Sequence, residues 1–144
     1  MRTFCFIFLI LNFTLFAEVD YKSLLKDTCK AYESLRSPNG DYLDTYFLNP
    51  GHMKNNKRVS SASTGIGLVS LSIAHKSAFD KNAAEKALKS LQFLNGKATI
   101  KPARNANGLF QHFYDYTTGK SNRPEYSTID TALLVSGAIF CKNT

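Results

Sequence analysis

The chain has 144 residues, and its 18 Lys and Arg exceed its 11 Asp and Glu to give a formal charge of +7. This length allows one small domain, and the basic residues are spread along the chain without a dense tract. Such a diffuse charge favours solubility or contact with anionic envelope surfaces. The sequence contains no RNA- or DNA-reading motif, so nucleic acid is not an expected partner.

Residues 1–17 have the pattern of a secretory signal peptide. Arg2 supplies a positive charge, an apolar run begins at Phe4, and Ala17 offers a small residue for cleavage. The run is shorter than the roughly 20 residues that span a bilayer. We therefore expect export to the periplasm or the medium, with no stable membrane insertion after cleavage and a mature domain over residues 18–144. An uncleaved N-terminal membrane anchor is the alternative.

The first element of the mature chain is a predicted helix over Tyr21–Arg36, because apolar residues recur there at steps of three and four. Ser37–Gly40 is a stop signal for this helix. The following segment, Asp41–Val59, is predicted to be a long loop, since it is too polar and too broken for a regular element.

Two further helices are predicted as an antiparallel pair with a short connection. One begins near Ser61 and runs to about Ala78, and Gly65 and Gly67 within it favour a close approach to another helix. Asp80 is the predicted N-cap of the next helix, which runs to a C-terminal stop at Gly96.

The C-terminal part combines an extended segment with the clearest helix of the chain. Leu109–Tyr116 is rich in aromatic residues and is predicted to be a strand of a hairpin or an ordered loop. Ser127 is the predicted cap of a helix over Ile129–Phe140, with Asp130 placed as in a capping box. This helix is apolar on every side and therefore needs partners on more than one face. Since the other helices offer little material to surround it, we expect a larger helical domain.

Two cysteines, Cys29 and Cys141, remain after signal cleavage, and each lies on an apolar helical face. An exported chain allows a disulfide between them, while a buried free cysteine acts as a small hydrophobe. The sequence leaves both possibilities open. His52, His75 and His112 lack the spacing of a zinc site, so no metal or other cofactor is expected.

Three carboxyl groups are candidates for catalysis: Asp115, Glu125 and Asp130. A pair of carboxyls cleaves glycosidic bonds, because one protonates the leaving oxygen and the other activates water or attacks the sugar. A helix N-terminus favours an ionised Asp130 as base, while a desolvated Glu125 would serve as acid. The candidate substrate-binding residues around them are His112, Tyr114 and Arg123.

Each carboxyl also has a purely structural interpretation. Asp130 is in place for helix capping, and Glu125 is close enough in sequence to Arg123 or Lys120 for a surface ion pair. Asp115 is in place to bond the backbone of the turn at Thr117.

Three blocks of sequence together resemble one known family: SASTGIGL at 61–68, GLFQHFYD at 108–115 and PEYSTIDTALL at 124–134. In this order they are similar to the bacterial glucoamylase-like domain family, found in endo-β-1,2-glucanase-type enzymes and at the end of cyclic β-1,2-glucan synthases. The resemblance extends from about residue 24 to residue 140.

The resemblance implies an all-α fold, a partial (α/α)6 toroid with about four helices and one short extended segment. It implies an exported glycoside hydrolase-like protein acting on glucan-type polysaccharide, with Glu125 and Asp130 as functional carboxyls. Because a whole toroid needs more helices, residues 18–144 would be its N-terminal part, associating with a missing C-terminal part. The alternatives are a non-catalytic truncated remnant and a basic envelope-binding helical protein.

Overall fold

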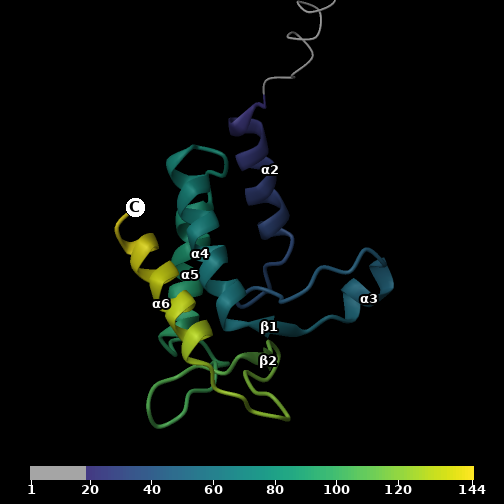
Figure 1. Cartoon of the computed structure of the whole chain (residues 1–144), viewed down its shortest axis with the longest axis vertical. Coiled ribbons are helices and arrows are strands. Elements are labelled where there is room, and N and C mark those ends of the chain that lie inside the picture. Colours follow the sequence, from purple (N-terminus) through teal and green to yellow (C-terminus); the bar gives the residue numbers. More distant parts are fainter. Residues whose placement is uncertain (1–18) are drawn as a thin grey trace, which may run out of the picture.

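The computed structural model describes residues 19–144, so the predicted signal peptide lies outside the described residues. Five helices and two strands follow in chain order: α2 (Tyr21–Glu33), α3 (Pro50–Asn55), β1 (Arg58–Ser60), α4 (Ser61–Lys76), α5 (Ala83–Leu94), β2 (Phe113–Asp115) and α6 (Thr128–Lys142). The described chain is thus mostly helical, as expected, with one small antiparallel sheet (Figure 1). None of the helices in residues 19–144 combines the length and apolar character needed to cross a membrane.

The prediction of a long loop without regular elements over Asp41–Val59 is wrong in part. Asn49 accepts hydrogen bonds from the backbone N–H groups of Gly51 and His52, and Pro50 occupies the first turn, so a short helix, α3, forms. This helix stands out from the other helices in Figure 1. β1 follows it and pairs with β2, which comes much later in the chain. Pairing with a distant segment leaves no mark in the local pattern, and the prediction missed β1 for that reason.

The central element is α4, which packs against α2, α5 and α6. Gly65 of α4 and Gly137 of α6 face each other: a Cβ on Gly65 would meet the backbone at Leu133, and a Cβ on Gly137 would meet the carbonyl of Gly65. A Cβ on Gly67 would meet the ring of the buried Tyr42. The expectation that the glycines of α4 permit a close approach to another helix is confirmed for Gly65, whereas Gly67 leaves room for the Tyr42 ring, which lies outside the helices.

The start of α5 differs from the prediction. Its N-cap position is Asn82, while Asp80 accepts hydrogen bonds from the Asn82 N–H at 2.9 Å and from Lys86 Nζ at 2.8 Å. Lys86 also lies 2.6 Å from Glu33 of α2, so these side chains join α2 to α5. The predicted stop is confirmed, because Gly96 has a φ of +71°, which favours glycine.

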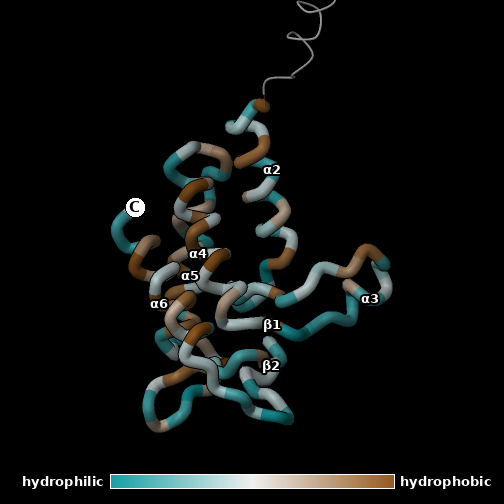
Figure 2. The backbone as a smooth tube through the Cα atoms, in the orientation of Figure 1, coloured by the Kyte–Doolittle hydropathy of each residue, from teal (hydrophilic) through white to brown (hydrophobic). Residues whose placement is uncertain are grey.

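Within residues 19–144, the helix that packs extensively against the apolar helix α6 is α4. Leu134 and Gly137 are buried against α4, whereas five large apolar side chains of α6 are exposed to solvent: Ile129, Leu133, Val135, Ile139 and Phe140. Figure 2 shows the strongly hydrophobic positions along this helix. The other helices of the described chain therefore do not surround α6, in line with the expectation from the sequence.

Cys29 and Cys141 are both free. Cys29 is buried on α2, and its thiol lies 3.7 Å from the Ser70 carbonyl of α4. The sequence leaves open a disulfide or two free cysteines, and the structure has free cysteines.

Candidate functional site

The site is built where the segment around β2 meets the N-terminal ends of α4 and α6. His112 lies directly before β2, and its backbone bonds to two segments distant in sequence: its N–H donates to the Glu125 carbonyl at 2.7 Å, and its carbonyl accepts from the Ser61 N–H at 3.2 Å. The Ser61 hydroxyl donates to the Gln111 carbonyl at 2.6 Å. These bonds fix His112 between α4 and the loop that carries Glu125.

Ser127 caps α6 as predicted, because its hydroxyl oxygen accepts the Asp130 N–H at 3.1 Å. The second bond of a capping box, from the Ser127 N–H to the Asp130 carboxylate, is not formed. The Ser127 N–H points instead to the Phe110 carbonyl, at 3.4 Å. The Asp130 carboxylate is therefore free of a capping role and is directed towards His112.

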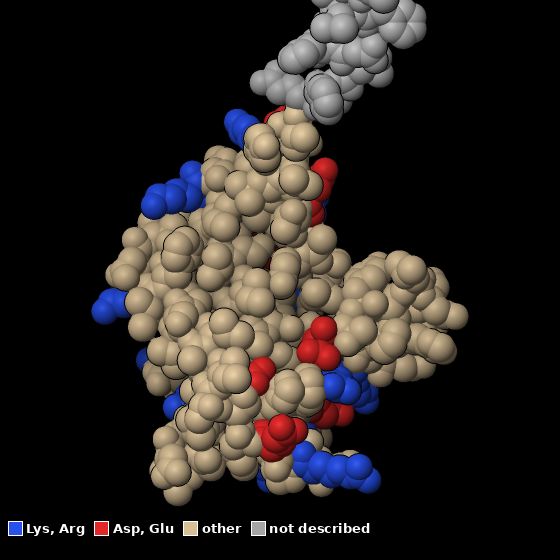
Figure 3. Space-filling view, viewed as in Figure 1, with Lys and Arg blue, Asp and Glu red and all other residues tan. Residues whose placement is uncertain are grey.

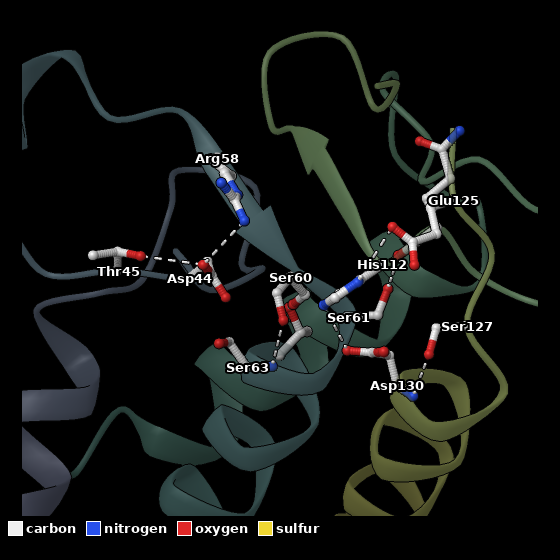
Figure 4. A network of polar contacts seen from close by, with 12 residues as sticks. Asp44, Thr45, Arg58, Ser60, Ser61, Ser63, His112, Glu125, Ser127 and Asp130 are labelled. Carbon is white, nitrogen blue, oxygen red and sulfur yellow. Dashed lines mark hydrogen bonds and ion pairs between the residues drawn. The ribbon is translucent and has the colours of Figure 1, made fainter. Parts of the chain in front are cut away.

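His112, Glu125 and Asp130 form one group, which we call the His112 cluster. The Nε2 atom of His112 lies 3.5 Å from Asp130 Oδ1, and its Nδ1 atom lies 3.9 Å from Glu125 Oε2. Figure 4 shows the imidazole between the two carboxyls. Since a neutral imidazole has a single N–H, it donates to one carboxylate at a time, whereas a protonated ring attracts both. The two carboxyls favoured by the sequence are thus brought together around one histidine.

The two carboxyls differ strongly in exposure, with 12 % of the Asp130 side chain and 75 % of the Glu125 side chain open to solvent. Glu125, which would serve as acid if it were desolvated, is the exposed carboxyl, and Asp130 is the one shielded from solvent. Asp130 lies in the first turn of α6, where backbone N–H groups and the helix dipole favour negative charge. Glu125 lies in the loop before α6, with its side chain open to solvent.

Asp115 and Tyr114 take structural positions beside the cluster. Asp115 Oδ1 accepts two hydrogen bonds from Thr117, one from its N–H at 2.7 Å and one from its hydroxyl at 2.6 Å. These are the bonds expected if Asp115 stabilises the turn. The Tyr114 ring is 2 % exposed, and burial together with the neighbouring Asp41 raises the pKa of its hydroxyl well above the ordinary value. The expected contact between Tyr114 and a substrate does not fit this burial, because a buried ring offers no face to a sugar.

Arg123 is exposed and lines a cavity of about 580 Å³ next to the cluster, which we call the basic cavity. Its wall is formed by Lys57, Arg58, Phe113, Tyr114, Asp115, Thr118, Lys120, Ser121, Asn122, Arg123 and Glu125. The proposed surface ion pairs of Glu125 with Arg123 or Lys120 are not formed: within residues 19–144, the ion-pair partner of Glu125 is His112. Figure 3 shows basic and acidic side chains gathered at the end of the molecule that carries β1 and β2.

Several residues at the site were not predicted from the sequence. Arg58 stacks on the Phe113 ring, with its guanidinium 3.6 Å from the ring centroid, and Ser61 holds the His112 backbone. Both lie on β1 and the start of α4, far from β2 in sequence, and only the sheet pairing brings them near. A correct prediction of the β1–β2 pairing would have found them.

The His112 cluster contains two carboxyls and one imidazole, and no group of three or more potential metal ligands in residues 19–144 is arranged to hold a metal ion. Comparison of the chain with family models, with curated proteins and with solved structures gives no match.

Proposed function

We propose that residues 18–144 belong to an exported glycoside hydrolase-like protein that acts on glucan-type polysaccharide. The observation that supports this most is the His112 cluster, in which two carboxyls from different elements lie around one histidine. The basic cavity, of a size typical of small-molecule sites, opens beside this cluster and shares Glu125 with it. Paired carboxyls next to an open cavity are the arrangement that hydrolysis of a glycosidic bond needs.

In this proposal the two carboxyls have different tasks. Asp130, partly buried at the N-terminus of α6, acts as base or stabilises positive charge on the sugar. Glu125 is exposed beside the basic cavity, where a bound sugar can reach it, and acts as the acid that protonates the leaving oxygen. His112 orients both carboxyls. Export and a partial (α/α)6 toroid are parts of the same proposal, and the exposed apolar side of α6 offers a surface for further helices.

The test is release of reducing ends from β-1,2-glucan by the wild-type chain and by Glu125→Gln and Asp130→Asn. We expect each substitution to lower kcat by about 100-fold or more, the usual contribution of a positioned acid or base. Asp27→Asn is the matched control, because Asp27 is an exposed carboxyl on α2 outside the cluster. Circular dichroism checks that each variant is folded. Absence of sugar release by the wild type, or full activity of both cluster variants, would contradict the proposal.

A second candidate is a non-catalytic helical protein that binds a partner through α6. The observation that favours it is the exposed apolar side of α6, where Ile139 is 55 % and Phe140 is 47 % exposed. If this second candidate is correct, the wild type self-associates or sediments as a complex with a partner. The double substitution Ile139→Lys with Phe140→Lys then abolishes the association, whereas substitutions in the His112 cluster leave it unchanged. Sedimentation velocity of these variants distinguishes the two candidates.

A further inference from the structure

The basic cavity carries more positive than negative charge. Four cationic side chains, Lys57, Arg58, Lys120 and Arg123, line it together with the carboxyls of Asp115 and Glu125. Arg58 lies 3.7 Å from Asp44, a residue outside the cavity wall. Within the part of the chain that the structure describes, the other three cations have no carboxylate at ion-pair distance. A cleft with a net excess of one sign of charge concentrates ligands of the opposite sign.

The aromatic rings of the cavity wall are not available for stacking. The Phe113 ring has the Arg58 guanidinium 3.6 Å from its centroid and the His112 ring also at 3.6 Å. Two groups at that distance cannot occupy the same face, so both faces of Phe113 are covered. Tyr114 is buried. Recognition in this cavity therefore depends on charge and hydrogen bonds.

The same observation decides between two kinds of anionic polymer. Proteins that hold single-stranded nucleic acid combine a basic groove with aromatic side chains on which the bases stack. The basic cavity lacks such a ring. It does contain the Asn122 amide, which can exchange hydrogen bonds with sugar hydroxyls. The Thr118 and Ser121 hydroxyls also line it, although each already bonds to the backbone of its own loop.

We propose that the basic cavity binds the anionic groups, carboxylate or phosphate, of an acidic glycan, and this inference rests on the proposed function. Glu125 belongs both to the cavity wall and to the His112 cluster. A glycan held by its negative groups in the cavity therefore extends over Glu125, with its neighbouring sugar at the cluster. The cations select the acidic substrate, and the cluster carries out the chemistry.

The experiment is calorimetric titration of the full chain with two matched pairs of ligands. One pair is tetragalacturonate and its methyl ester, and the other is maltotetraose phosphate and maltotetraose. We expect the charged member of at least one pair to bind about tenfold or more tightly than its neutral counterpart, with an affinity that falls as salt is added. The pair that shows the larger preference distinguishes carboxylate from phosphate.

The variant Lys120→Ala with Arg123→Ala is expected to lose this preference. Lys76→Ala with Lys89→Ala removes the same number of charges from exposed positions on α4 and α5 and is expected to keep it. Equal binding of charged and neutral ligands, or an unchanged preference in the cavity variant, would overturn the inference. Equally tight binding of a thymidine oligonucleotide would overturn it too, in favour of a general polyanion site.

The two proposals fail in different ways. Charge-selective glycan binding without any hydrolysis would support the cavity assignment and contradict the hydrolytic function. Hydrolysis of neutral glucan that depends on Glu125 and Asp130, without a preference for acidic ligands, would support the hydrolytic function and overturn the cavity assignment.

Discussion

Asp41 is the most unusual single residue outside the site. It is fully buried, its Oδ1 accepts a hydrogen bond from the Ser37 hydroxyl, and its Oδ2 has no hydrogen-bond partner in residues 19–144. Burial raises the pKa of this carboxyl above its ordinary value. The native state thus binds a proton at Asp41 more tightly than the unfolded chain does.

This leads to a prediction for Asp41→Asn. The contribution of Asp41 to stability is fully present below its unfolded pKa of about 3.9 and is lost as the pH rises through the higher native value. Asn keeps an oxygen that accepts from Ser37 but does not ionise. We therefore expect the variant to be at least as stable as the wild type at pH 7, and the advantage to shrink towards pH 4, in urea unfolding at a series of pH values.

The exposed Asp27→Asn serves as control for this series, since its side chain is 66 % exposed. It should show no comparable change with pH. If Asp41→Asn is destabilised at pH 7 by more than at pH 4, the ionised carboxylate stabilises the fold and the account of its burial is wrong.

Asp130 illustrates why the role of a single residue is hard to assign from sequence. Its position three residues after Ser127 fits a capping box, and composition alone favours plain capping over a role in chemistry. In the structure Ser127 alone supplies the cap, because its own N–H is taken by the Phe110 carbonyl. That bond comes from a segment distant in sequence, so no local pattern could decide the question.

At the scale of elements, the contact between α4 and α6 leaves no room for a side chain on either of its two facing glycines. The backbones meet at Gly65 and Gly137, where a Cβ on either glycine would meet the other helix. We expect Gly65→Ala to lower the free energy of unfolding by about 1–3 kcal/mol, as overpacking usually does. Because α6 must shift, Asp130 moves away from His112, and activity on glucan should fall as well. Thermal unfolding and reducing-end release measure the two effects.

Gly51→Ala is a matched control on α3. A Cβ at Gly51 would meet only the Asn49 side chain, at 3.2 Å, and alanine favours helix. This variant should be close to wild type in stability and activity. Equal effects of the two substitutions would show that the α4–α6 contact is not as close as described.

Element type followed from the sequence wherever a strong helical period was present, as in α2, α4, α5 and α6. The ends were less certain: α2 stops at Glu33 rather than Arg36, because the Leu35 N–H bonds to the Tyr32 carbonyl in a tighter turn. β1 was missed because a strand of three residues has no readable period, and its stability comes from pairing with β2.

On the scale of the whole molecule, the site exists because the segment around β2 and the loop before α6 are held against β1 and the start of α4, which are distant from them in sequence. β2 pairs with β1, which leads directly into α4, and the His112 backbone bonds to both Ser61 and Glu125. The sequence could identify Glu125, Asp130 and His112 as candidates, since they are close along the chain and of suitable chemistry. It could not predict the burial of Tyr114, the position of Arg58 or the cations of the basic cavity, which depend on this assembly.

The central claim is that Glu125 and Asp130 act together in one site around His112. The most direct test is a double-mutant cycle in kcat on β-1,2-glucan with Glu125→Gln, Asp130→Asn and the double variant. Residues that act as a unit are strongly non-additive, so we predict that the double variant loses little more activity than the worse single variant. If the fold-loss of kcat in the double variant equals the product of the two single losses, as for independent sites, the claim is contradicted.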